Sequence, residues 1–121
     1  MNYINLSNLQ LKTFTEQDAS DYCQINNLNP DDIIKLMLDN NKITNISGVK
    51  LFKNLRQLYL NNNKIKDISV LKDLNSLKIL SIINLELESD QIKYIKSLKK
   101  PKELYPYKGF KDMTALLNTI K

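Results

Sequence analysis

Apolar residues recur at a fixed spacing along the middle of this chain. The segment LMLDNNKITNISGVKLFKNLRQ, residues 36–57, aligns with LYLNNNKIKDISVLKDLNSLKI, residues 58–79, at a period of 22 residues. The matched columns are Leu36 and Leu58, Leu38 and Leu60, Asn41 and Asn63, Ile43 and Ile65, Ile46 and Ile68, Val49 and Leu71, Phe52 and Leu74, and Leu55 and Leu77. Self-similarity at such a period is typical of a repeat architecture.

Two weaker copies of the unit flank these two. Residues 80–103 keep the apolar columns with Leu80, Ile82 and Leu87, and then run two residues longer before Ile92, Ile95 and Leu98 restore the apolar spacing. Residues 4–35 keep the same offsets with Ile4, Leu6, Leu9 and Leu11. Both weaker copies place a leucine, Leu9 or Leu85, in the asparagine column. We therefore expect a different turn in those two copies.

Each LxL segment predicts a short strand whose two leucines point to the same side, because strand side chains alternate with a period of two. A unit of about 22 residues cannot bury its own leucines, so neighbouring units have to stack and share a core. We expect Leu36, Leu58 and Leu80 to form one ladder in that core. Asn41 and Asn63 stand where the chain turns away from the strand, and an inward amide there can satisfy both backbone N–H and C=O groups.

The pattern LxLxxNxI followed by IxxLxxLxxL resembles the leucine-rich repeat family, in its 22-residue internalin-type class. The resemblance implies an α/β fold, a short right-handed solenoid of about four to five coils with a concave parallel sheet and short 3₁₀ or irregular segments on the convex side. We expect one leucine-rich-repeat domain over residues 1–121. It divides into an N-terminal capping coil and helix (1–35), the repeats (36–103), and a C-terminal strand and capping helix (104–121).

Both flanking segments predict helices that would cover the open ends of the solenoid. The first helix has Thr15 as its N-cap with Asp18 three residues on. We expect Tyr22, Cys23 and Ile25 to pack on the first coil, which we favour over a reactive thiol at Cys23. The last helix would place Phe110, Met113, Leu116, Leu117 and Ile120 on one face. With both ends covered, the protein should be monomeric when alone.

Composition then narrows the function. The chain has 121 residues and no histidine, which removes the commonest general base and the commonest metal ligand. Its single cysteine cannot form an internal disulfide, and no apolar run is long enough to enter a membrane. The first ten residues lack the features of a signal peptide, so we expect a cytoplasmic location. We expect no catalysis, no cofactor and no metal.

The candidate binding surface is the solvent side of the concave sheet. The residues beside the inward leucines include Met37 and several tyrosines, which are enriched in interface cores. The residues that we expect to contact a partner are Met37, Asp39, Tyr59, Asn61, Ser81, Ile83, Tyr105 and Tyr107. In the alternative, the capping helix or a terminal segment folds over the last two coils and buries Ile83, Tyr105 and Tyr107. The resemblance implies a non-catalytic module that binds another protein, and a specific version is a small bacterial or phage antagonist.

Charge is uneven along the chain. Residues 1–34 carry a net −4, whereas residues 93–111 carry seven lysines against Glu103, a net +6. Five of these lysines form a candidate anion-binding site: Lys93, Lys96, Lys99, Lys100 and Lys102. The second hypothesis is therefore binding of nucleic acid or an anionic surface, although an ordinary solvated lysine-rich face is favoured over it. Attraction between the acidic N-terminal part of one molecule and the basic C-terminal part of another is a further possibility that the charges allow.

Overall fold

The computed structural model describes residues 2–96 and 103–105. Five short strands form one sheet in the order of the sequence: β1 (Tyr3–Asn5), β2 (Lys35–Met37), β3 (Gln57–Tyr59), β4 (Ile79–Ser81) and β5 (Glu103–Tyr105). Every neighbouring pair is parallel. The register places Leu36 opposite Leu58 and Leu58 opposite Leu80, so the predicted pairing of these columns is confirmed.

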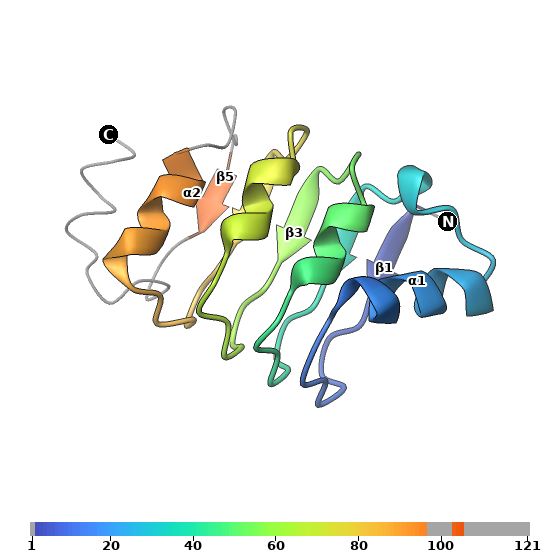
Figure 1. Cartoon of the computed structure of the whole chain (residues 1–121), viewed down its shortest axis with the longest axis horizontal. Helices are drawn as coiled ribbons and strands as arrows, with labels where there is room; N and C mark the ends of the chain where they lie inside the picture. Colours follow the sequence, from blue (N-terminus) through green and yellow to red (C-terminus); the bar gives the residue numbers. More distant parts are fainter. Residues whose placement is uncertain (1, 97–102, 106–121) are drawn as a thin grey trace.

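Each connection between strands carries helical structure on one side of the sheet, as Figure 1 shows. The first connection holds α1 (Glu16–Ile25) and η1 (Pro30–Asp32), and the next two hold the 3₁₀ segments η2 (Ser47–Leu51) and η3 (Ser69–Asp73). The fourth holds η4 (Ser89–Gln91) and α2 (Ile92–Lys96). We call this the helical side, and the opposite face, which the sequence predicts to be concave, the sheet face.

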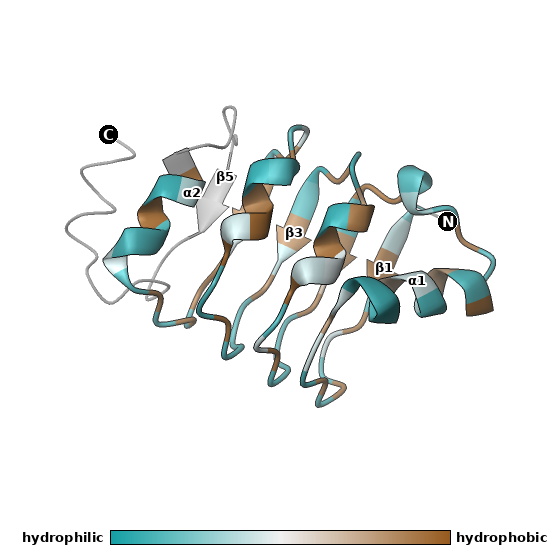
Figure 2. Cartoon of the chain, viewed as in Figure 1, coloured by the Kyte–Doolittle hydropathy of each residue, from teal (hydrophilic) through white to brown (hydrophobic). Residues whose placement is uncertain are grey.

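The core lies between the strands and the helical side. In β2 and β3 the middle residue is buried and its two neighbours are only partly buried, which is the alternation expected of the LxL segments. Leu38, Leu60 and Ile82 continue the inward column with no exposed surface. In Figure 2 apolar residues recur at corresponding places in successive coils. The core is therefore shared between coils, as the period predicts.

The fourth coil keeps the apolar spacing after its longer run. Ile92 and Ile95 of α2 are buried at 7% and 4% exposure, as the sequence predicts, whereas Leu98 lies outside the described residues. The predicted C-terminal capping helix also lies outside them, and of residues 104–121 only β5 is described.

Helix α1 occupies the helical side of the first coil. Thr15 caps it as predicted: its side chain accepts from the Asp18 N–H, and the Asp18 carboxylate accepts from the Thr15 N–H. Cys23 is buried, and burial raises the pKa of its thiol, so the group stays neutral and packs as a small apolar side chain. The start of the helix approaches η2 so closely that a Cβ on Gly48 would lie 2.3 Å from the Thr15 carbonyl oxygen.

The prediction that Ile25 packs on the first coil is wrong, because this side chain is 82% exposed. Figure 1 shows the physical reason: α1 runs along the long axis of the molecule, and its last turn extends past β1. Ile25 is the last residue of the helix. It therefore lies beyond the coil that it was expected to cover.

The asparagine column forms the turns at the ends of the strands, as predicted. Asn41 and Asn63 are 8% and 7% exposed. The Asn63 side chain donates to the carbonyls of Leu38 and Leu60, at 2.9 and 3.0 Å, and accepts from the Ile43 N–H at 3.1 Å. Each amide thus satisfies its own turn and the turn of the preceding coil.

Asn41 serves the first coil in the same way. Its oxygen accepts from the N–H groups of Leu9 and Leu11, both at 3.0 Å, and its nitrogen donates to the Leu6 carbonyl at 3.0 Å. Because Asn41 supplies these bonds from the second coil, the first coil can carry Leu9 where later coils carry asparagine.

The two coils that carry leucine in this column do turn differently. All four coils have an asparagine with positive φ just before the column, at Asn8, Asn40, Asn62 and Asn84. The leucine-bearing coils add a second positive φ just after it, at Gln10 and Glu86. The expectation of a separate turn around Leu9 and Leu85 is confirmed.

Asn63→Leu should lower the free energy of unfolding by about 2 kcal/mol or more, because it leaves buried backbone groups of two coils without their amide partner. Urea unfolding followed by circular dichroism measures the change. Asn75→Leu, at an exposed position, is the matched control. If Asn63→Leu costs no more than the control, the turn has converted to the form seen at Leu85, and the amide is dispensable.

Candidate protein-binding face

The sheet face is built from the residues that alternate with the buried leucines. The strand register aligns them in two rows across the sheet: Tyr3, Lys35, Gln57 and Ile79 in one, and Asn5, Met37, Tyr59 and Ser81 in the other. Asp39, Asn61 and Ile83 follow at the ends of the strands and are partly buried. The alternation that buries the leucines therefore brings the predicted surface residues together on one face.

Tyr59 lies in the central strand of this face. Its hydroxyl donates to the Gln57 side-chain oxygen at 3.1 Å. The Lys35 ammonium lies 5.7 Å from the centre of the Tyr59 ring, within the range of a cation–π contact. These contacts hold the ring in place while part of it stays accessible. Met37 is its direct neighbour in β2.

The predicted residues Asp39, Asn61 and Ser81 join one coil to the next. The Asp39 carboxylate accepts from the Asn61 N–H at 2.7 Å. The Asn61 side-chain oxygen in turn accepts from the Ile83 N–H at 2.7 Å and from the Ser81 hydroxyl at 2.8 Å. Sequence reasoning placed these side chains on the surface but did not foresee that they hold the ends of neighbouring strands together.

Burial of Asp39 raises the pKa of its carboxyl group, and the hydrogen bond from the Asn61 N–H partly offsets this rise. Desolvation penalises the negative charge, while the N–H dipole favours it. Asn61 makes the same kind of bond in the next coil with a neutral amide. The ionised carboxylate of Asp39 therefore lowers the stability of the fold through its desolvation, whereas the neutral amide of Asn61, at the same place in the next coil, does not.

The expected accessibility of Ser81 is wrong, because this residue is only 3% exposed. Ser81 lies at a position of β4 that faces the sheet face, but its hydroxyl donates to the Asn61 side-chain oxygen. Ser81 can support the surface by fixing Asn61. It offers a partner almost no area of its own.

The remaining predicted residues divide between different places. Tyr105 belongs to β5, where its backbone pairs with Ser81, and Tyr107 lies outside the described residues. Lys93 and Lys96 belong to α2 on the helical side, and the Lys93 ammonium lies 5.2 Å from the Tyr94 ring centre. The other candidate lysines, Lys99, Lys100 and Lys102, lie outside the described residues.

The structure adds Tyr3 to the sheet face, which sequence analysis did not include. It is 47% exposed and pairs with Lys35 across the first two strands. The signal was present in the sequence, because Tyr3 and Asn5 flank Ile4 as Lys35 and Met37 flank Leu36.

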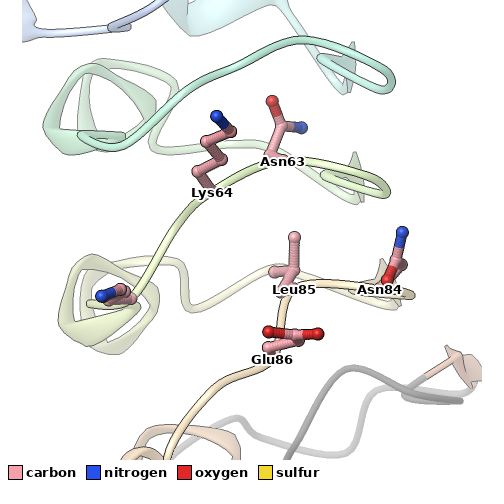
Figure 3. Close-up of a pocket in the computed structure, with 6 residues that line it drawn as sticks. Asn63, Lys64, Asn84, Leu85 and Glu86 are labelled. Carbon is pink, nitrogen blue, oxygen red and sulfur yellow. The ribbon is translucent and has the colours of Figure 1, made fainter.

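An open hollow of about 360 Å³ lies at the turns of the third and fourth coils, where the asparagine column changes to leucine. Figure 3 shows Leu85 pointing toward the coil that carries Asn63 and Lys64. Lys64, Lys66 and Glu86 also line the hollow. Its charges are of both signs.

Comparison with known families supports the repeat assignment. Residues 31–73 match the family model described as Leucine Rich repeats (2 copies). This segment carries two leucine-rich repeats. Such domains generally mediate protein–protein interaction and are typically non-enzymatic, and the parallel sheet fits a leucine-rich-repeat solenoid. No curated protein matches the chain. Within residues 2–96 and 103–105, none of the helices is long and apolar enough to span a membrane.

Asp39→Asn should raise the free energy of unfolding near neutral pH, because an amide oxygen can accept the Asn61 N–H without a buried charge. The folded-state pKa of Asp39 lies above the unfolded value, so the folded protein binds more protons between the two values. The ionised group therefore lowers stability above this window. The advantage of the variant should shrink as the pH falls through the folded pKa and vanish below the unfolded one.

Urea unfolding of the parent and the variant at a series of pH values, from neutral to about pH 3, measures this effect. Asp73→Asn, which removes an exposed carboxylate on η3, is the matched control. If Asp39→Asn does not raise the free energy of unfolding at neutral pH, the charge of the Asp39 carboxylate is compensated by a partner and the prediction is wrong.

Proposed function

We propose that this chain is a non-catalytic module that binds another protein through its sheet face, with Tyr59 at the centre of the contact. The observation that carries the proposal is the cluster of Tyr59, Met37 and Lys35 in the middle of the sheet. Aromatic residues and methionine are enriched in interface cores, and tyrosine is among the residues that contribute most of the binding energy.

The way the face is held supports the proposal. The Tyr59 ring already has its hydroxyl bonded to Gln57 and its face covered by Lys35. The bonds from Asp39 to Asn61 and from Asn61 to Ile83 fix the strand ends. A surface that is ordered before binding loses less conformational entropy when a partner arrives, so more of the contact energy appears as affinity.

Within this proposal the predicted residues have unequal roles. Met37, Tyr59 and Ile83 would supply apolar contact, and Asp39 and Asn61 would frame it. Ser81 would act through Asn61. Tyr105 and Tyr107 would extend the contact toward the C-terminal end. Tyr3, which pairs with Lys35, extends it toward the N-terminal end.

The finer assignment is also part of the proposal. We infer a right-handed solenoid of the 22-residue internalin-type class from the period of the repeat units, and helical caps at both ends from the flanking segments 1–35 and 104–121. The proposed role is that of a small bacterial or phage antagonist that works in the cytoplasm by occupying a surface of its target.

The competing function is binding of nucleic acid or an anionic surface through Lys93, Lys96, Lys99, Lys100 and Lys102. It depends on the net charge of +6 over residues 93–111. Lys93 and Lys96 lie on α2, on the opposite side from the sheet face. The two functions therefore require different surfaces and can be separated by variants.

The test combines Met37→Lys with Tyr59→Glu, which places opposite charges in the apolar centre and should weaken partner binding at least about tenfold. Tagged protein is used to capture partners from its native cells, and calorimetry with the purified partner then gives the affinity. Lys72→Glu with Asp73→Lys on η3 is the matched control, with the same number of changes and no change in net charge.

Retention of the partner by the Met37→Lys, Tyr59→Glu variant would contradict the proposal. Loss of binding in Lys93→Glu with Lys96→Glu, together with affinity for RNA or DNA that falls steeply with salt, would favour the alternative.

A further inference from the structure

The first coil carries an open hollow with apolar walls. It has a volume of about 300 Å³ and lies between α1 and the turn that follows β1, with walls from Leu6, Leu11, Phe14 and Tyr22. Leu6, Leu11 and Tyr22 are only partly buried, so apolar surface stays accessible there. Leu9, in the turn between Leu6 and Leu11, is 54% exposed. The hollow can therefore receive the apolar part of a side chain from another molecule.

Two carboxylates of α1 also line this hollow, those of Asp18 and Asp21. They are three residues apart, so they are neighbours on one face of the helix. Asp18 accepts through Oδ2 from the Thr13 hydroxyl and the Thr15 N–H, both at 2.9 Å, and Asp21 accepts through Oδ1 from the Gln17 side chain at 2.8 Å. Among the residues that the structure describes, none donates a hydrogen bond to the other oxygen of either group. Each carboxylate is thus held by one oxygen and can offer the other to a ligand.

The charge of the hollow is negative. The hydrogen bond from the Thr15 N–H lowers the pKa of Asp18, so this carboxyl group is ionised near neutral pH. Lys12 also lines the hollow, but within the described part of the chain it forms no ion pair with either carboxylate. The surrounding sequence, residues 1–34, carries a net −4. A cationic group is therefore the complementary occupant.

We propose that this hollow binds an arginine side chain of a partner protein. The aliphatic stem of the arginine lies on the apolar walls, and its guanidinium group donates to the free oxygens of Asp18 and Asp21 beside the Tyr22 ring. A guanidinium group is planar, stacks on aromatic rings and presents several N–H donors in a fixed fork, so it can bond to two carboxylates at once. The ammonium group of lysine is compact and more strongly hydrated, so it fits apolar walls less well.

This site lies apart from the proposed partner-binding centre. Helix α1 is on the helical side of the sheet, as Figure 1 shows, whereas Tyr59 is on the sheet face. The arginine site therefore does not depend on the proposed function of the sheet face, and the two can be tested separately.

A nuclear magnetic resonance titration of the isotope-labelled full-length protein tests the proposal. The probe is a short glycine–serine peptide with blocked ends and one arginine. At millimolar concentration it should shift the backbone amide signals of Thr13, Asp18 and Tyr22. The same peptide with citrulline, which keeps the shape but not the charge, should bind at least about tenfold more weakly, and the lysine peptide about threefold more weakly.

Asp18→Asn with Asp21→Asn should weaken binding of the arginine peptide at least about tenfold, because it removes both charges. Each new amide keeps an oxygen that can accept the hydrogen bonds of the carboxylate it replaces, so the fold should be kept. Circular dichroism and urea unfolding verify this. Asp73→Asn with Asp90→Asn, at exposed positions of η3 and η4, removes the same charge and should bind the peptide like the parent.

Lys12→Ala gives a change in the opposite direction, which damage to the fold cannot produce. It removes the cation that lines the hollow and should tighten binding of the arginine peptide about two- to threefold. The bonds that Thr44 makes to residue 12 use its backbone carbonyl, so they remain in the variant.

Four results would overturn the proposal. The first is the absence of shifts around the hollow with the arginine peptide at millimolar concentration. The second is equal binding of the citrulline or lysine peptide, which would show an apolar contact or a general response to charge. The third is unchanged binding by Asp18→Asn with Asp21→Asn. The fourth is loss of peptide binding in Met37→Lys with Tyr59→Glu, which would place the peptide on the sheet face.

Discussion

The first two coils in this structure depend on the coil that follows for backbone hydrogen bonds as well as for a core. Where the chain leaves a strand and turns, some of its N–H and C=O groups find their partner only in the next coil. A buried amide from the following coil supplies them, as Asn41 does for Leu9 and Leu11 and as Asn63 does for Ile43 and Leu38. Since burial of these groups without a partner would be costly, the turns fix the register in which the leucine columns stack. The sheet follows from this stacking.

The regular rows of residues on the sheet face result from the same stacking of coils. Once Leu36, Leu58 and Leu80 are in register, the residues between them must emerge in rows on the opposite face. Rows of this kind bring Lys35 of β2 over the Tyr59 ring of β3, and the Tyr59 hydroxyl donates to Gln57 of its own strand. The side chains of Asp39 and Asn61 then bond across the strand ends. The sheet face thus has a fixed shape without any loop or lid.

Periodicity predicted the columns, the parallel sheet and the buried asparagines, because each of these repeats with the unit. It even indicated the altered turns at Leu9 and Leu85, since a leucine cannot make the bonds of an amide. It did not predict what depends on one coil alone. The orientation of α1 leaves Ile25 exposed, and the bond from Ser81 to Asn61 removes Ser81 from the accessible surface. Nor did it show that the exposed amides of Asn40, Asn62 and Asn84 bond to one another, because an alignment column carries no information on side-chain rotamers.

The amide bonds between turns also have a direction. Asn41 completes the turn of the first coil, and Asn63 completes that of the second, so each coil is completed by residues that come later in the chain. Synthesis proceeds from the N-terminus, so the bond at Leu9 has to wait for Asn41, 32 residues later, and the bond at Ile43 for Asn63, 20 residues later. In a chain that folds during synthesis, the leucines of the newest coil would therefore stay exposed to solvent until the next coil covers them.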